Sequence, residues 1–382
     1  MVARNTVRVL VLWADNKAAN YGLRVLANGN AAIVRRALAG MAVEVDFQDF
    51  GPGDSPISFG TKSILRDVFS RRGPIKTKLR NYDLIIDSGA GDSFADIYGF
   101  KRLSFIIYAH LMIRFLRIPL ILGPQTIGPF ESRVGRFFAK QSLNQAQIVL
   151  ARDSESTDFS RRLGRGADIT VTDVVFALDT PPMRKSSSTD VLVNVSGLLW
   201  FSDDHVDSTK YRDSVVALVS ELTSREIGVA LLAHVVNSPS GNDDVDACHE
   251  AAARIKKETG RAVELLVPRD LGEARDMVAA AFLVVGARMH ACLNAISVGT
   301  PAIPWAYSRK FKPLLDDLDW RMTVDLRTDP YPAQTTMSMI LDTDWAERRN
   351  YLQHILSTAH ERLEQASSVI GSYYSRDREK IV

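Results

Sequence analysis

The sequence predicts a two-domain α/β protein in which each domain holds a doubly wound, mostly parallel sheet. Short apolar runs rich in β-branched residues alternate with amphipathic runs of helical length, and this alternation occurs twice along the chain. A segment rich in proline, serine and charge separates the two series. A chain of 382 residues is long enough for two ordinary domains. We therefore expect two Rossmann-like domains that face one another across a cleft.

The first series defines an N-terminal domain at residues 1–177. Its β-branched runs predict strands at Val7–Trp13, Val43–Phe47, Leu84–Asp87, Leu120–Leu122, Ile148–Ala151 and Ile169–Val171. The amphipathic runs between them predict helices at about Leu23–Ala39, Leu103–Leu116, Arg133–Asn144 and Glu155–Leu163. Because strands alternate with helices, the sheet is expected to be parallel and covered on both faces.

The second series defines a C-terminal domain at residues 191–344, after a linker at 178–190. Strands are expected at Val191–Val195, Gly228–Ala233, Val263–Val267, Phe282–Val285 and Ala302–Trp305. Helices are expected near Tyr211–Ser224, Asp243–Thr259, Leu271–Ala280 and Ala291–Val298. The tail at 345–382 has a helical pattern and is expected to pack back across the first domain.

The composition is that of a soluble globular protein, with 46% hydrophobic and 24% charged residues. A net charge of +2 does not argue for a nucleic-acid partner. Positive charge nevertheless crowds what we interpret as a Gly/Pro-containing loop region, at Arg66, Arg71, Arg72, Lys76, Lys78 and Arg80. We favour a solvated loop, and the alternative is a region that faces an anionic substrate or a lipid surface.

Cysteine use and apolar runs predict a cytoplasmic location. Cys248 and Cys292 are too few and too isolated for a disulfide framework or a zinc site, so a reducing compartment is expected. The Val7–Trp13 run is short and lacks a cleavage pattern, which favours a strand over a secretory signal. The other apolar runs, at 115–122 and 277–287, fall short of the roughly 20 residues that a spanning helix needs. Any membrane association is expected to be peripheral, at the inner membrane face.

The most informative segment is Gly286-Ala-Arg-Met-His290, where an apolar run meets an amphipathic one. This is typical of a strand that turns into a helix, and ligands bind at that edge of an open α/β sheet. The fork of donors in Arg288 suits a carboxylate or phosphate, and His290 can exchange a proton near neutral pH. The alternative is structural: an arginine that pairs within the fold and a histidine at a helix N-terminus.

Polar loops after predicted strands of the first half supply further candidates. The loop from Asn16 to Asn30 contains Asn20, and the segment from Asp87 to Asp96 contains Asp92. Glycines there allow backbone N–H groups to approach an anion, and the carboxylates suit a hydroxylated substrate. Tight turns with capping aspartates are the alternative.

Two more strand ends in the first half, and one in the second, carry candidates. Gln125 lies in Leu122-Gly-Pro-Gln-Thr-Ile-Gly-Pro-Phe130, and Arg152 precedes a helix that Asp153 or the next serine is expected to cap. In the second half, His234 ends a strand and Asn242-Asp243 opens a helix. We expect this last group to share an edge with Arg288 and His290, although a lone strand-end histidine is more often structural.

In their order along the chain, these segments resemble the polysaccharide pyruvyltransferase family. The matching motifs span about Trp13 to Leu318 and are the Asn-Tyr-Gly loop, Asp83 to Asp96, Gly123-Pro-Gln-Thr-Ile-Gly-Pro-Phe130, Arg152-Asp-Ser-Glu-Ser156, Asp173-Val-Val-Phe176, the His234 and Asn242-Asp243 segment, and Arg288-Met-His290 through Gly299-Thr-Pro301 to Tyr307-Ser-Arg-Lys310. Two departures concern the acceptor side: Gly22-Leu23 replaces Gly-Asp, and Ser88-Gly89-Ala90-Gly91 replaces a triple glycine.

The resemblance implies a fold similar to B-type glycosyltransferases and a phosphoenolpyruvate-dependent ketal-pyruvyltransferase. Such an enzyme joins a pyruvyl group to two hydroxyls of a hexose in a cell-surface glycan, lipid-linked precursor or glycolipid. His290 and Arg288 are the expected catalytic residues. Donor binding is expected from Arg288, His290, Arg152, His234 and Lys310, and acceptor binding from Asn20, Asp92, Asp96 and Gln125.

Neither a metal nor a cofactor is expected, since cationic side chains can carry the phosphate charge and phosphoenolpyruvate is a substrate. His234 is interpreted either as a second proton carrier or as a phosphate ligand, and Asp92 or Asp96 either orients the acceptor or serves as the base. Two other functions stay open: a nucleotide-sugar-dependent glycosyltransferase or epimerase, and a non-catalytic glycan-binding subunit.

Overall fold

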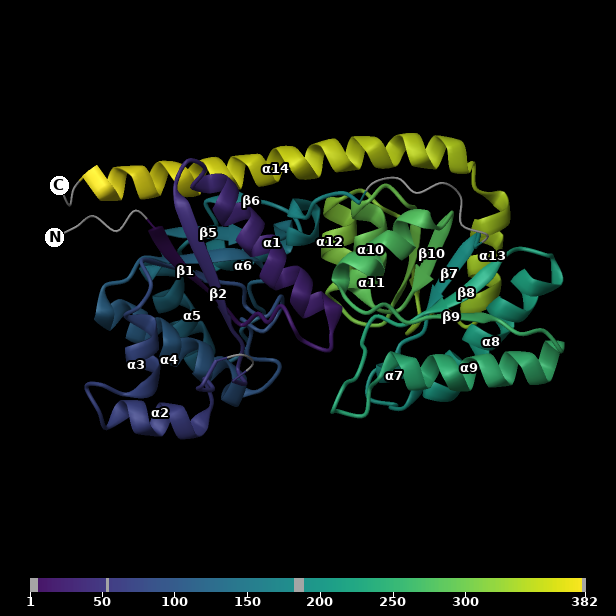
Figure 1. Ribbon diagram of the computed structural model, residues 1–382, viewed down its shortest axis with the longest axis horizontal. Helices are drawn as coiled ribbons and strands as arrows, with labels where there is room; N and C mark the ends of the chain where they lie inside the picture. Colours follow the sequence, from purple (N-terminus) through teal and green to yellow (C-terminus); the bar gives the residue numbers. More distant parts are fainter. Residues whose placement is uncertain (1–5, 53–54, 182–188, 380–382) are drawn as a thin grey trace. The chain divides into compact units, whose positions relative to one another are not determined.

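The chain forms two compact α/β units in a computed structural model that describes residues 6–52, 55–181 and 189–379 (Figure 1). Unit 1 comprises Met1–Ala18, Leu23–Leu178 and Ala359–Val382. Unit 2 comprises Ala19–Gly22 and Asp179–Thr358. The expected linker at 178–190 falls partly outside the described residues.

The sheet of unit 1 has six parallel strands in the order β2-β1-β3-β4-β5-β6. The strands are β1 (Thr6–Leu12), β2 (Ala42–Gln48), β3 (Leu84–Asp87), β4 (Leu120–Gln125), β5 (Ile148–Ala151) and β6 (Ile169–Thr170). In register, Val9 of β1 pairs with both Val45 and Leu84. Strands β3, β4 and β5 are buried along their whole length, as expected for a parallel sheet covered on both faces.

Helices cover both faces of this sheet. They are α1 (Tyr21–Ala37), α2 (Thr61–Val68), α3 (Pro74–Leu79), α4 (Phe100–Leu116), α5 (Arg133–Gln145), α6 (Ser154–Arg162) and the 3-10 helix η1 (Val174–Ala177). Figure 1 shows α2 to α5 on one side of the sheet and α1 on the other, together with the part of α14 (Trp345–Glu379) that belongs to unit 1. The hydroxyl of Ser367 in α14 donates to the carbonyl of Ile33 in α1, at 3.4 Å. The part of the tail in unit 1 therefore packs on the first domain, as expected.

The sheet of unit 2 is also six-stranded and parallel, in the order β12-β11-β10-β7-β8-β9. Its strands are β7 (Val191–Asn194), β8 (Val229–Leu232), β9 (Glu264–Leu266), β10 (Leu283–Gly286), β11 (Ala302–Ala306) and β12 (Val324–Asp325). Its helices are α7 (Gly197–Trp200), α8 (Ser208–Ser224), α9 (Asp244–Thr259), α10 (Leu271–Ala280), α11 (Met289–Ser297), α12 (Phe311–Asp317) and α13 (Pro332–Asp342). The predicted two-domain α/β fold is confirmed.

One region differs from its expectation. The region from Arg66 to Arg80, interpreted as a solvated loop, overlaps the short helices α2 and α3. Lys76 is buried, and its ammonium group offsets the lost hydration by donating to the carbonyls of Asp67 at 2.5 Å and Ser70 at 2.9 Å. The sequence pattern does not predict α2, because Asp67 is its fully buried residue and, of its large apolar residues, only Ile64 packs against the core. Within the described ranges, no helix is long and apolar enough to cross a membrane.

Candidate functional site

The strand order of unit 2 reverses between β7 and β10, and this reversal positions Arg288. From β7 the chain proceeds outward through β8 and β9, and it then returns to β10 on the other side of β7. Asn194 ends β7, and its side-chain carbonyl accepts the backbone N–H of Arg288 at 2.9 Å. Arg288 and His290 therefore lie at the carboxyl-end reversal point where open α/β sheets bind ligands.

The guanidinium of Arg288 is held by Asp244, at the start of α9. Arg288 Nη2 lies 2.6 Å from Asp244 Oδ1, and Nε donates to both carboxylate oxygens at 3.1 and 3.3 Å. The same Nη2 also donates to the carbonyl of Asn242 at 3.0 Å. This two-point contact fixes the plane of the guanidinium more tightly than a single contact would.

Asp244 also joins the surrounding loops. Its carboxylate accepts backbone N–H groups from Gly197 at 2.8 Å and from His234 and Val235 at 3.0 Å each. Burial alone would lower the pKa of Arg288, but the Asp244 charge and its hydrogen bonds raise that pKa above its ordinary value. Arg288 is thus a permanent cation at the sheet edge.

His234 lies beside this ion pair in a fixed tautomer. The amide oxygen of Asn294 accepts from Arg275 at 2.9 Å, so its amide nitrogen faces the Nε2 atom of His234, at 3.2 Å. An amide nitrogen can only donate, which makes Nε2 the acceptor and leaves the ring proton on Nδ1. That Nδ1 is buried and has no hydrogen-bond partner among the described residues.

His234 is neutral at physiological pH. It is 1% exposed, and burial, with the charges of His290 and Arg288, lowers its pKa to about 3. A neutral ring favours the predicted role of a hydrogen-bonding ligand over that of a second proton carrier.

The Asn20-Tyr21-Gly22 segment belongs to unit 2 rather than to the first domain, where the sequence placed it. Asn20 forms an isolated antiparallel β-bridge with Val235, and the Tyr21 N–H donates to the carbonyl of His234 at 3.2 Å. The Tyr21 ring lies edge-on to the His234 ring, with centroids 5.6 Å apart. The predicted acceptor residue Asn20 therefore lies on the same unit as four of the predicted donor residues, whereas the fifth, Arg152, belongs to unit 1.

Gly22 makes close packing against His290 feasible. A Cβ atom at position 22 would lie 2.7 Å from Nδ1 of His290. Only glycine allows the start of α1 to approach the imidazole this closely. The segment thus forms a wall beside His290.

The next strand of unit 2 adds Tyr307 and Lys310. Tyr307 follows β11 and is one of the groups that raise the pKa of Arg288, so it lies near the guanidinium. Lys310 is half-buried at the start of α12. Its role as a donor ligand stays a prediction.

The sequence did not single out Asp244, Asn294 or Arg275, and it marked Tyr21 only as part of the Asn-Tyr-Gly loop. Asn294 carries a signal, because it follows His290 by four residues on α11 and lies on the same helix face. Asp244 has a weaker one: it follows Asp243, whose carboxylate caps α9 as expected for such a pair. Its pairing with Arg288 depends on the folded sheet.

In unit 1, Arg152 is buried and forms an ion pair with Asp173. It is 2% exposed, with Nη1 at 3.3 Å from Asp173 and Nη2 at 2.5 Å from the hydroxyl of Thr126. Its contact with a donor anion stays a prediction, and in the structure it ties the ends of β4 and β5 to η1.

The three predicted acceptor residues of unit 1 have structural partners as well. Asp96 accepts the N–H groups of Glu131 and Ser132 and the Ser132 hydroxyl, at 2.7 to 2.9 Å, and so supports the start of α5. Gln125 is fully buried and donates to Asp87. Asp92 accepts from the Tyr98 hydroxyl at 2.7 Å. Acceptor binding by these residues stays a prediction.

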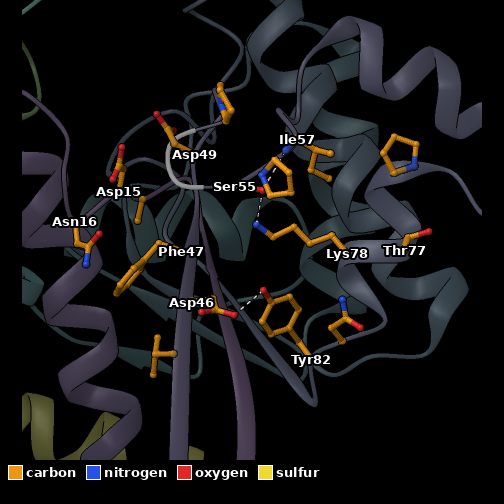
Figure 2. A pocket seen from close by; sticks show the side chains of 16 residues that line it. Asp15, Asn16, Asp46, Phe47, Asp49, Ser55, Ile57, Thr77, Lys78 and Tyr82 are labelled. Atoms are coloured by element: carbon orange, nitrogen blue, oxygen red, sulfur yellow. Dashed lines mark hydrogen bonds between the residues drawn. The ribbon is translucent and has the colours of Figure 1, made fainter.

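Unit 1 contains a polar pocket of about 670 Å³ beside β2 (Figure 2). Its lining comes from the segment after β1, from β2, from Pro52 and Ser55–Ile57, and from α3 and the turn after it. This volume lies in the range of about 300–1,000 Å³ that is usual for small-molecule sites. Among the lining residues, Asn16 belongs to the loop from Asn16 to Asn30 that the sequence marks as a candidate.

The pocket presents carboxylates and one amine. Figure 2 shows Lys78 extended across it, donating to Ser55 at 2.9 Å, and Tyr82 bonded to Asp46 at 2.8 Å. Burial, with a smaller contribution from the Asp15 charge, raises the pKa of Asp49. Burial likewise lowers the pKa of Lys78. Groups of both signs favour a neutral ligand with many hydroxyls over an anion. The described residues contain no group of three or more His, Cys, Asp or Glu side chains arranged to hold a metal ion.

The family model for polysaccharide pyruvyl transferase matches residues 20–309, which include the unit 2 site. In unit 1 the match extends over β2 to β6.

Solved structures share the two-domain fold at low sequence identity. A Staphylococcus aureus MnaA complex with UDP aligns with a TM-score of 0.58 at 13% identity, covering 94% of each chain. The Neisseria meningitidis UDP-GlcNAc 2-epimerase bound to UDP-GlcNAc aligns with a TM-score of 0.57 at 10% identity, covering 97% of this chain and 100% of that one. Anabaena HepE with UDP gives 0.55 at 13%, covering 98% of this chain and 100% of that one. The fold is that of B-type glycosyltransferases and related epimerases.

The neutral state of His234 predicts a pH-dependent stability. Its pKa is about 3 in the folded protein and about 6.5 in the unfolded chain, so the unfolded state binds more protons between these values. The free energy of unfolding should therefore fall as the pH falls through this range. Between pH 7 and 5 the wild type should lose about 2 kcal/mol more than the His234→Gln variant. Urea titrations of both proteins at each pH measure this difference, and parallel losses would contradict it.

Proposed function

Because the chain belongs to the polysaccharide pyruvyl transferase family, we propose that it transfers a pyruvyl group from phosphoenolpyruvate to two hydroxyls of a hexose. The product is a cyclic ketal, and phosphate is released. The hexose is part of a cell-surface glycan, a lipid-linked precursor or a glycolipid. The observation that carries this proposal is the fixed cation of Arg288 beside the buried N–H of His234.

This pair suits a small dianionic donor. Arg288 offers a charged group whose orientation Asp244 has already set, so little entropy is lost when an anion binds. His234 adds an uncharged hydrogen-bond donor beside this cation. We assign phosphate or carboxylate binding to Arg288 and a hydrogen bond to the same anion to His234, with Lys310 as a further cation.

His290 is assigned to proton transfer. Protonation of the methylene carbon of phosphoenolpyruvate leaves a cationic centre at C2, which a sugar hydroxyl attacks while a base takes its proton. The bond from C2 to the phosphate oxygen then breaks, and a second hydroxyl attacks the regenerated centre and loses its proton. Of the two hydroxyl protons, one replaces the proton given to the methylene carbon and the other leaves on the phosphate. Phosphate departs with the bonding electrons, and Arg288 stabilises its charge. In this proposal no step uses a metal or a cofactor.

We place the acceptor sugar in the polar pocket of unit 1. Its carboxylates accept from sugar hydroxyls, and Lys78 and Asn16 donate to them. Sugar hydroxyls that donate to Asp49 would also offset the cost of burying it, since burial raises its pKa despite the Phe50 backbone hydrogen bond and the Arg102 charge.

The direct test is phosphate release from phosphoenolpyruvate by the purified protein with a panel of simple hexosides, followed by mass spectrometry of the sugars. Release together with a pyruvylated sugar supports the proposal. Thermal stabilisation by UDP or a UDP-sugar, without any response to phosphoenolpyruvate, would indicate a nucleotide-sugar enzyme instead. Sugar binding with no donor binding would indicate a glycan-binding protein.

The His290→Ala variant should lose at least about 100-fold in kcat, since general acid catalysis contributes about that much or more. Its melting temperature should stay near that of the wild type, because His290 is only partly buried. The matched control is His249→Ala, which removes an exposed histidine from α9 in the same unit. Retained turnover by His290→Ala would remove this residue from the mechanism.

The Gly22→Ala variant should lower kcat by about tenfold or more, because the added methyl group displaces the imidazole of His290. Alanine favours a helix over glycine by up to about 1 kcal/mol, so lower helix stability is not the expected cause. Gly166→Ala is the control, since its Cβ would meet only Arg161, at 3.9 Å. Equal activity of the two variants would show that the approach of Gly22 to His290 is irrelevant to turnover.

Asp49→Asn should raise the KM for the acceptor several-fold and leave the KM for phosphoenolpyruvate unchanged, because it removes a hydrogen-bond acceptor from the pocket. Asp92→Asn is the comparison, since the sequence also places Asp92 on the acceptor side. Steady-state kinetics with both substrates varied distinguishes them. An effect at Asp92 alone would move the acceptor from the pocket to the loop after β3.

A further inference from the structure

Exposed apolar side chains are concentrated on unit 1. Sixteen large hydrophobic residues are exposed among the described residues, and eleven of them lie between Leu65 and Phe138. Those on helices α2, α4 and α5, or next to them, are Leu65, Val68, Phe69, Phe100, Leu111, Phe115, Val134, Phe137 and Phe138. Single exposed apolar residues are ordinary, but so large a group in one region indicates an interaction surface.

Helix α2 shows the feature most clearly. It buries only Asp67, whereas Leu65 and Val68 are exposed and Phe69, just after the helix, is 86% exposed. A helix that packs on a core does the reverse. The Asp67 carboxylate accepts from the Tyr108 hydroxyl at 2.8 Å and the half-buried Ile64 packs against the core, so α2 is fastened to the unit while Leu65 and Val68 stay exposed.

The exposed charges of these three helices have one sign. Helix α4 carries Lys101, Arg102 and Arg114, and α5 carries Arg133, Arg136 and Lys140. Neither helix contains an aspartate or a glutamate. On α2 the exposed charges are Lys62 and Arg66.

The three helices cover the same side of the unit 1 sheet (Figure 1). Helix α4 contacts both α2 and α5. We call the exposed residues of these helices, together with Phe69, the basic aromatic face.

We propose that the basic aromatic face docks the protein on a membrane whose surface carries anionic lipid headgroups. Phenylalanine and leucine enter the boundary between headgroups and acyl chains, while arginine and lysine contact the phosphates. A second copy of the chain fits poorly, because a symmetric contact would bring two basic faces together. This inference does not rest on the proposed reaction.

The test is flotation of the full chain with vesicles of phosphatidylcholine alone or mixed with phosphatidylglycerol. Binding should require phosphatidylglycerol and should weaken as salt is raised. Binding to both kinds of vesicle alike, or to neither, would overturn the proposal.

Matched variants locate the contact. The triple change Phe69→Ser, Phe115→Ser and Phe137→Ser, and separately Arg133→Gln with Arg136→Gln, should each weaken partitioning about tenfold or more. The control is Phe201→Ser with Tyr331→Ser, which removes exposed aromatic residues from unit 2 and should leave partitioning unchanged. Circular dichroism and melting temperature check the fold of each variant. Equal losses in control and test variants, or a dimer in light scattering that the test variants dissociate, would overturn the proposal.

Discussion

The ion pair between Asp244 and Arg288 is the contact on which the unit 2 site depends. Asp244 is completely buried, and its carboxylate joins the guanidinium to backbone N–H groups after β7 and β8. Breaking such a pair from one side would leave a charge in an apolar interior, at a cost of about 3–5 kcal/mol. Loss of the Asp244 carboxylate would therefore disturb three features at once: the orientation of the Arg288 guanidinium, the position of His234 and the start of α9.

The two units present opposite chemistry at the ends of their strands. Unit 2 offers a permanent cation at Arg288 and a neutral imidazole donor at His234. Arg288 is held by the carbonyl of Asn242, and His234 is held by the side-chain amide of Asn294. The unit 1 pocket offers carboxylates with an amine between them. An anion is bound best by a cation, whereas sugar hydroxyls also need hydrogen-bond acceptors such as carboxylates. This difference supports our assignment of the pyruvyl donor and the sugar acceptor to separate units.

Strand ends and motif order were predictable from the sequence, whereas partners were not. The apolar run before Gly286 located the end of β10, and with it Arg288 and His290, within a residue or two. Asp244 was missed because a pair of aspartates before a helix already has a local explanation as a cap. The sequence places Tyr21 in the first domain because it lies between segments of that domain. The order of residues along the chain does not show that this loop packs on unit 2 instead. Helix α2 was missed because Leu65 and Val68, two of its three large apolar residues, are exposed.

The short segment Ala19–Gly22 has a consequence for how the protein can be divided. It lies between two stretches of unit 1 in the sequence, yet its backbone bonds to His234 and Val236, and its tyrosine hydroxyl bonds to the carbonyl of Pro268. A gene fragment that encodes 179–358 alone would therefore lack the tyrosine that covers the His234 ring. Unit 2 is not a contiguous module, and any transplant or separate expression of it must carry these four residues along.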